Sequence, residues 1–570
     1  MGKTATTLSL LAAVAVAGHA YAQSPPNSSV ARDFVAPGPS EPLPSTLAAA
    51  LGGVQESALA AHVAFLASPG LAGRGLGSRG LDAALEYAAA ALALAGVPPL
   101  QGEESGGTEH SRYFQPVPLR EIRGVTGRLT IERRQGEERW SRTFQAGMDC
   151  LLPDVAPQSL AGPVVFAGYG IQEPRLGHDD YRGLDVRGRI VLVLGGLPPG
   201  DAWRAPELLR RYDAKDEDER FAVKLAAARE AGASAVLAVD PGRWSPPASQ
   251  SPDARPPVFL PVDAARRGDG PLLFRISPAV AAAILGGARS PGPGPATTHP
   301  GDLAGVRASI EITGDERVIV SRNALGAIVG SDPQMRDQAV ILGAHLDHLG
   351  EVGDVVYPGA DDNASGVAAL LEIAKAFAGL PGGAQRTVVF AFWTGEEEGK
   401  LGSGHFVRYP LWPLTRTVAY LNLDMIGHPW ALDEIRKLVS DSGLPGGEAY
   451  VAGMKPPDFV EPGLPPDAPE LEAALRQAAH GTGLALHLDR TDGTHGGSDY
   501  RDFARAHVPF IRFFGNFFPG YHEPGDTAES LDAGQVQRVA RLALATAWLL
   551  ANPASAPSTR GPAARPPNTR

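Results

Sequence analysis

Cysteine is nearly absent from this chain, whose 570 residues include only Cys150. A single thiol excludes an intramolecular disulfide, and it also excludes a structural zinc cluster built from several cysteine thiolates. The fold must therefore be stabilised by hydrophobic cores or by metals bound through other side chains.

Positive charge is also scarce. The 51 Lys and Arg residues are outnumbered by 63 Asp and Glu residues, which gives a formal net charge of -12. This balance argues against a nucleic-acid partner. With 44% hydrophobic and 20% charged residues the composition is that of a globular protein, and the length suggests two or three domains.

No apolar run after the N-terminal one is long enough to span a membrane. Lys3, the apolar residues 8–17 and the small-x-small sequence at 20–22 predict a signal peptide that is cleaved before Gln23. The run is shorter than the roughly 20 residues of a membrane span. We therefore expect an exported protein, periplasmic or secreted, with no membrane association after cleavage.

Shifts in composition predict a divided chain. Segments rich in Pro, Gly and Ser mark its ends and the borders of a central region of short strands. We expect a catalytic domain in two parts, interrupted by a smaller α/β insert, with disordered ends. The expected ranges are 1–22 for the signal peptide, 23–48 for a disordered leader, 50–158 for the first catalytic part, 159–305 for the insert, 310–553 for the second catalytic part with the site, and 554–570 for a disordered tail.

Two local patterns precede the insert. Alternating polar and apolar residues at 127–134 and 139–146 predict a hairpin at a sheet edge. The glycine-rich sequence GLAGRGLGSRG at 70–80 superficially resembles a phosphate-binding loop. It lacks the lysine of such a loop and has no clear strand before it, so we interpret it as a turn.

Three apolar runs in the second catalytic part predict buried strands of a parallel sheet. They span residues 339–342, 388–393 and 418–423. In open α/β sheets, ligands bind outside the carboxyl ends of the strands. Each run is followed by side chains able to hold a metal, namely His345, the pair Glu396 and Glu397, and Asp424. One such residue would mean little, but the set predicts a metal site.

The inventory of side chains suits two metal ions, which need one bridging carboxylate and about two private ligands each. His345 and Asp424 could serve one metal, and Glu397 and His522 the other. Either member of the Asp361–Asp362 pair could bridge. The remaining assignments are Glu396 as general base, Asp347 as the partner that orients the His345 ring, and His348 in a supporting or structural role.

At these residues the chain resembles the M28 family of zinc peptidases, of the co-catalytic aminopeptidase type. The resemblance covers roughly residues 55–155 and 315–553. It implies an α/β fold with a mixed, mostly parallel central sheet flanked by helices, and two zinc ions or other divalent metals. The matching motifs are AHLDHLG, GADDNASG, GEEEGKLGS, LNLDMIG, GGSDY and YHEPGDT.

The resemblance also implies roles for single residues. Asp362 becomes the bridging ligand, because it lies four residues before Gly366, and a cis peptide bond is implied between Asp362 and Asn363. Many relatives have His where this chain has Tyr500, so no role is carried to that position. The implied roles are His345 and Asp424 on one zinc, Glu397 and His522 on the other, Glu396 as general base, Asp347 orienting His345, and Tyr521 contacting the tetrahedral intermediate.

The insert resembles a protease-associated (PA) domain, a module with no chemistry of its own. The implied function of the whole chain is hydrolysis of N-terminal residues from peptides by an exported dizinc aminopeptidase. A carboxypeptidase or dipeptidase on the same scaffold stays open, as do a catalytically dead binding module and a glutaminyl-cyclase-like transferase. The sequence leaves side-chain preference and oligomeric state undetermined.

Overall fold

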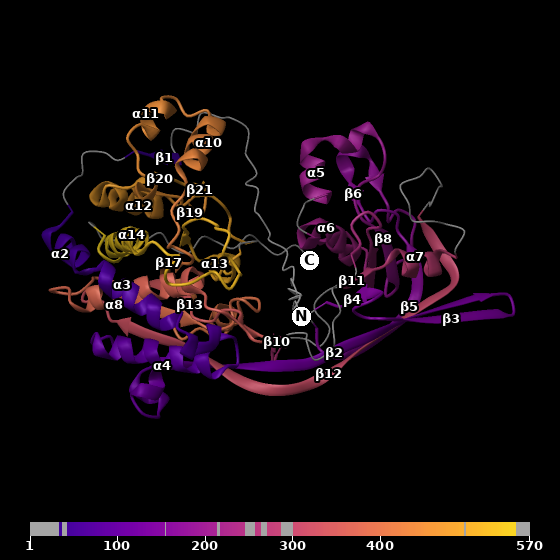
Figure 1. The fold of residues 1–570 in the computed structure, drawn as a ribbon, viewed down its shortest axis with the longest axis horizontal. Coiled ribbons are helices and arrows are strands. Elements are labelled where there is room, and N and C mark those ends of the chain that lie inside the picture. The colour runs from indigo at the N-terminus through magenta and orange to yellow at the C-terminus, as the bar shows by residue number, and fades with distance from the viewer. Residues whose placement is uncertain are drawn as a thin grey trace, which may run out of the picture. The chain divides into compact units, whose positions relative to one another are not determined.

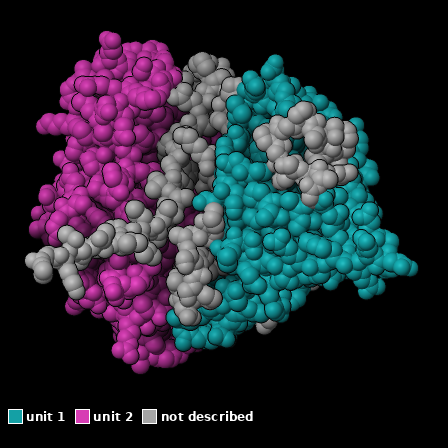
Figure 2. Space-filling model, turned by 45° about the vertical axis from the view of Figure 1, so that its right-hand side comes forward, with its two compact units in different colours: residues 1–21, 119–319 teal, residues 22–118, 320–570 magenta. Residues whose placement is uncertain are grey.

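The computed structural model describes residues 33–36, 43–153, 155–213, 217–245, 257–263, 271–286, 300–494 and 497–553 (Figure 1). The signal peptide expected at 1–22 and the tail expected at 554–570 lie outside these residues. The described residues form two compact units (Figure 2). We call them unit 1, within Leu119–Ile319, and unit 2, within Ala22–Pro118 and Val320–Arg570.

The centre of unit 2 is a mixed sheet whose parallel core consists of the predicted strands. Strand β13 (Ala339–His345) is parallel to β16 (Thr387–Trp393) and β17 (Thr417–Leu423), and β17 is parallel to β22 (Phe510–Phe513). The end of β12 (Gly301–Ile328) pairs antiparallel with β16. All residues of β13 and β16 are buried, which explains their nearly continuous apolar sequences. The predicted α/β class is confirmed.

Helices cover both faces of this sheet. Alternate residues of β13 belong to different cores, because successive side chains of a strand point to opposite faces: Val340 and Leu342 lie in one core and Ile341 in the other. The first core contains residues of α3 (Glu56–Leu66), α4 (Arg79–Leu94), α8 (Gly366–Ala378), α12 (Pro469–Thr482) and α14 (Ala533–Ala551). The second contains residues of α9 (Leu401–Arg408) and α13 (Tyr500–Arg505).

Part of the expected disordered leader is folded. Strand β1 (Phe34–Val35) pairs antiparallel with β20 (Ala485–His487), and β20 pairs with β18 (Phe459–Val460). Helix α2 (Ser45–Gly53) also begins inside the leader. The prediction of disorder is wrong for these residues, because both side chains of β1 are buried. Within the described residues no single helix is long and apolar enough to cross a membrane, although α2 and α3, joined at a bend, pass that test together.

Unit 1 contains the strands predicted in the insert. Strands β5 (Gln158–Phe166), β8 (Ile190–Leu194), β9 (Ala235–Val239) and β11 (Leu272–Ile276) are parallel in that order. The predicted hairpin is present as β2 (Phe114–Gln135) and β3 (Glu138–Gln145). Its apolar side chains share a core with β5, β8 and β9, so the unit begins at residue 119, ahead of the expected boundary at 159. The likeness to a PA domain stays a prediction.

Candidate metal centre

The carboxyl ends of three neighbouring strands in unit 2 carry the predicted ligands. His345 is the last residue of β13, and Asp424 directly follows β17. Glu396 and Glu397 follow β16 after a short turn. Asp362 lies in the turn Ala360–Ser365 that leads into α8. Parallel strands end at one edge of a sheet, and that edge is where these side chains meet.

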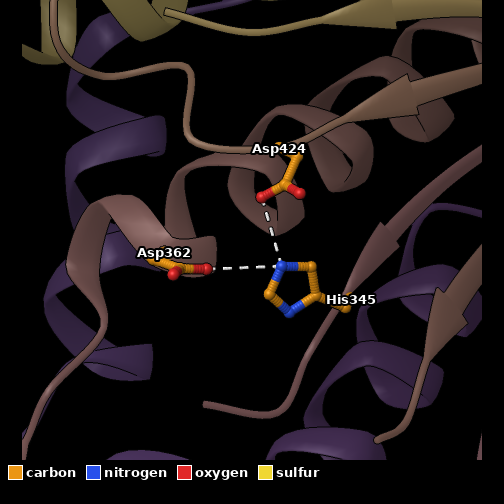
Figure 3. A group of neighbouring side chains, drawn as sticks. All are labelled: His345, Asp362 and Asp424. Atoms are coloured by element: carbon orange, nitrogen blue, oxygen red, sulfur yellow. Dashed lines mark hydrogen bonds and ion pairs between the residues drawn. The ribbon is translucent and has the colours of Figure 1, made fainter. Parts of the chain in front are cut away.

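One group of side chains surrounds His345. Its Nε2 atom lies 3.1 Å from Asp424 Oδ1 and 3.3 Å from Asp362 Oδ1. Figure 3 shows both carboxylates pointing at this single ring nitrogen. The nitrogen carries at most one proton, so it cannot donate a straight hydrogen bond to both oxygens at once. A divalent cation between the three atoms would be bound by all of them.

A second group forms around the other oxygen of Asp362. Oδ2 of Asp362 lies 3.1 Å from His522 Nε2, which is 3.2 Å from Glu397 Oε2. His348 Nδ1 lies 2.6 Å from Glu397 Oε1 and 3.8 Å from Asp362 Oδ2. Asp362 therefore faces the two groups with different oxygens, which is the geometry of a bridging carboxylate. His348, interpreted from sequence as supporting or structural, lies among the candidate ligands.

In both groups of side chains, hydrogen bonds and opposite charges between carboxylates and imidazoles shift the pKa values of the residues. Burial would raise the pKa of Asp362, but hydrogen bonds from His345 and His522 hold it well below its usual range. Burial and Asp362 oppose ionisation of Glu397, but His348 and His522 lower its pKa to about 2. Burial would lower the pKa of His345, but Asp424 and Glu396 raise it well above normal. In this state protons on the imidazoles balance charge that a metal ion would otherwise balance.

Glu396 lies beside these groups and belongs to neither. Its side chain is buried, and burial raises the pKa of its carboxyl well above normal, against the opposing charges of His345 and Lys400. The ammonium of Lys400 is 3.1 Å from Glu396 Oε1. A carboxyl group held at the rim of a metal centre with a raised pKa is suited to take up a proton.

Asp347 contacts its neighbours differently from the expectation. The Nδ1 atom of His345 donates to the backbone carbonyl of Asp347 at 3.2 Å, so the contact that orients the ring does not use the carboxylate. The carboxylate instead accepts the backbone N–H groups of Glu396 and Glu397 at 3.1 and 3.2 Å. Asp347 thus joins two ligand segments, because it fixes one ring through its carbonyl and the adjacent loop through its side chain.

Sequence reasoning gave no role to Asp526, which holds the segment of the candidate ligand Asp362. Its two oxygens accept the backbone N–H groups of Asp361 and Asp362 at 2.8 and 3.0 Å. Asp361 points elsewhere, because its Oδ1 accepts the N–H of Gly427 at 2.7 Å. The bond between Asp362 and Asn363 is cis, as the resemblance implies. The available signal for Asp526 was its place in the YHEPGDT motif.

Tyr521 adjoins the second group. Its ring stacks on that of His522 with 3.9 Å between centroids. Burial, reinforced by Asp362 and Glu397, raises the pKa of its hydroxyl, which therefore keeps its proton and acts as a donor. This placement agrees with the contact implied by the resemblance, and the role itself stays a prediction.

Fold and site together define an α/β protein with a candidate metal centre of histidine and carboxylate side chains at the carboxyl ends of the strands. Residues 323–547 match the model of Peptidase family M28. These residues, about two fifths of the chain, are therefore similar to that family. The match includes β13, β16, β17 and all five predicted ligands.

Several relatives share this region. A probable lipoprotein aminopeptidase, LpqL, of Mycobacterium tuberculosis is 27% identical over 248 residues, which are 39% of this chain and 44% of that protein. A probable zinc metalloprotease of Pyrenophora tritici-repentis is 27% identical over 283 residues, 44% of this chain and 63% of that protein. Leucine aminopeptidase 2 of Trichophyton equinum is 28% identical over 239 residues, 38% of this chain and 41% of that protein. The chain thus spans about half the length of these curated relatives.

Solved structures are also similar. The aminopeptidase from Aneurinibacillus sp. strain AM-1 aligns with a TM-score of 0.49 and 18% identity, covering 88% of this chain and 95% of that chain. A zinc aminopeptidase from Bacillus subtilis aligns with a TM-score of 0.45 and 19% identity, covering 87% of this chain and 95% of that chain.

Proposed function

We propose that this chain is an exported zinc metallopeptidase that removes N-terminal residues from peptides. The observation that carries the proposal is Asp362, whose two oxygens face the His345 group and the His522 group separately. Relatives described as aminopeptidases and as a zinc metalloprotease support the reaction and the metal. Export rests on the expected signal peptide alone.

The donor set fits two divalent ions. His345 and Asp424 would hold one zinc, Glu397 and His522 the other, and Asp362 both. Imidazole and carboxylate donors without thiolate suit zinc, and they also accept other divalent metals. When bound, zinc polarises the scissile carbonyl and acidifies a water molecule.

The mechanism assigns each step to a side chain of the centre. Glu396 takes a proton from the attacking water on its carboxylate and then gives it to the leaving amine. Lys400 holds the Glu396 carboxylate in place through their 3.1 Å ion pair. The Tyr521 hydroxyl donates a hydrogen bond to the oxygen on which charge develops. The carboxylates of Asp347 and Asp526 hold the segments that carry the ligands in position, because they accept hydrogen bonds from the backbone N–H groups of those segments.

The test combines metal content with substrate choice. Purified residues 23–570 are analysed for zinc, and hydrolysis of an amino-acid anilide with a free amine is compared with that of its N-acetylated form. Two zinc ions per chain with cleavage of the free-amine substrate alone is the expected result. Two zinc ions without cleavage of either substrate would point to a carboxypeptidase or dipeptidase. A protein without metal or activity after zinc is added would contradict the proposal.

A further inference from the structure

The glycine-rich segment at residues 70–80 contains no candidate ligand, yet it carries a completely buried charge. Arg74 ends the short helix η1 (Pro69–Arg74), and its side chain has 0% exposure. Its backbone lies in the left-handed region, with φ of 53°. A buried arginine in a strained turn is costly unless its donors are all occupied and its conformation is held by neighbours.

The guanidinium of Arg74 joins the two loops that carry metal-centre residues. Nε donates to the carbonyl of Leu346 at 2.8 Å, and Leu346 stands between His345 and Asp347. Nη1 and Nη2 donate at 2.8 Å to the carbonyls of Pro358 and Gly359, just before the aspartate pair. Nη1 also donates to the carbonyl of Leu66 within the same arm of the chain. Four of the five guanidinium donors are thus used on backbone carbonyls.

The glycines beside Arg74 allow this approach. A Cβ atom on Gly73 would lie 2.3 Å from the carbonyl oxygen of Tyr357 and 2.5 Å from that of Gly350. A Cβ atom on Gly75 would lie 3.0 Å from the Cα of Gly350. Gly350 and Tyr357 are paired at the base of the hairpin β14 (Gly350–Val352) and β15 (Val355–Tyr357), which connects the two loops. The segment packs directly against the chain between the ligands.

The charge of Arg74 matches its surroundings. Burial lowers the pKa of Arg74 to about 10, against the attraction of Asp362, Asp526, Asp347 and Glu397, so the guanidinium stays charged at neutral pH. Lysine has three donors on one nitrogen and cannot span both loops, whereas the planar fork of arginine can. An apolar residue would leave several buried carbonyls unpaired.

We propose that Arg74 is a positioning residue of the metal centre, which fixes the distance between the loop of His345 and the loop of Asp362. The inference rests on the proposed function in that the centre must bind zinc. Arg74 lies outside the sheet and outside residues 323–547, which match the family model. The centre would therefore depend on a residue far from its ligands in the sequence. The distance between the two loops matters because zinc tolerates little variation in the positions of its ligands.

The experiment compares Arg74→Lys with Arg79→Lys, which alters an exposed arginine of the same segment. Zinc affinity is measured by competition with a chromophoric chelator, together with the Tm of the metal-free protein and kcat and KM for the anilide. Arg74→Lys is expected to bind zinc about 10- to 100-fold more weakly, since this is the usual effect of losing a supporting contact. Its kcat should fall by a larger factor than its KM changes. Arg79→Lys should match wild type. Wild-type zinc affinity in folded Arg74→Lys would overturn the inference, even if its Tm were lower.

Hydrogen exchange on the wild-type chain tests the inference without any variant. Adding zinc should slow exchange in a peptide covering residues 66–75 as well as in peptides covering 345–348 and 358–362. Slowing in the two ligand loops with no change at 66–75 would overturn the role of Arg74. Failure of the wild-type chain to bind zinc would contradict the proposed function itself, whereas equal zinc binding by wild type and Arg74→Lys would contradict the role of Arg74 alone.

Discussion

The two units bury charged side chains in different ways. In unit 1, Arg220 pairs with Asp240 at 2.8 Å. Lys224, 1% exposed, donates to the carbonyls of Leu194 and Gly196 at 2.7 Å. Each of these charges meets its partners at short range within one neighbourhood of the fold. In both cases the partners named here are groups of the protein itself.

In unit 2, the buried charges of the candidate metal centre converge on shared atoms. Asp362 and Asp424 approach one nitrogen of His345, and Glu397 and Asp362 approach one nitrogen of His522. These three carboxylates outnumber the two protons that the two imidazole nitrogens can donate to them. Convergence of acidic groups on an imidazole, rather than burial of charge as such, is therefore the feature that points to a metal.

The largest effect expected in unit 2 concerns turnover. Glu396→Gln should keep its zinc and lower kcat by about 10²- to 10⁴-fold, because an amide cannot accept the proton. The matched control is Glu398→Gln, which changes an exposed neighbour. Metal analysis and anilide hydrolysis of both variants provide the check. Near-normal turnover in Glu396→Gln would rule out its role as base.

The convergence itself is tested by exchanging one carboxylate for an amide. Asp362→Asn should lose zinc from both positions, since among the described residues Asp362 alone faces both groups. Asp361→Asn should retain zinc, because burial already raises the pKa of Asp361 well above normal and its Oδ1 accepts an N–H that an amide oxygen can also accept. Zinc per chain by elemental analysis distinguishes the two. Loss of zinc from Asp361→Asn alone would reverse the assignment of the bridge.

Zinc should stabilise unit 2 without affecting unit 1. A ligand present at 100 times its Kd adds about 2.7 kcal/mol to the free energy of unfolding. Hydrogen exchange of peptides from α8 and β13 should slow on adding zinc, whereas peptides from β8 and β9 should not change. Asp362→Asn serves as the control that removes the effect. Equal slowing in both units would show that the metal stabilises the chain at another place.

A further effect is expected in unit 1 and depends on pH. Burial lowers the pKa of Lys224 to about 7, from about 10.5 in the unfolded chain. Between these values the unfolded chain binds the extra proton, so stability rises with pH from about 7 to about 10.5, by at most ~1.4 kcal/mol per pH unit. Urea unfolding should show this slope in wild type and lose it in Lys224→Met. Lys375→Met, at an exposed lysine, is the control, and an identical pH slope in wild type and Lys224→Met would exclude the effect.

The sequence predicted the elements whose signal is local. Continuous apolar runs predicted β13, β16 and β17, which are buried along almost their whole length. Residues directly after such runs must lie at one sheet edge, so the approximate location of His345, Glu397 and Asp424 followed from strand order alone.

The leader illustrates where local signals fail. Phe34 and Val35 lie in a segment rich in Pro and Ser, which favours disorder by composition. They are nevertheless buried, because β20, more than four hundred residues later in the chain, offers an edge with which they pair. Composition averages over a window and cannot register a two-residue strand whose partner is that distant.

What the sequence by itself determined is therefore the α/β class, the identity of the candidate ligands and their order on the strands. Tertiary structure alone decided which atoms are in contact: the backbone carbonyl of Asp347 accepts from His345, and the carboxylate of Asp526 accepts the backbone N–H of Asp362. It also decided that Arg74 reaches a carbonyl 272 residues away. The physical reason is that a hydrogen bond depends on direction and on distances of about 3 Å. Such distances are set by the packing of segments far apart in the chain, which residue spacing does not record.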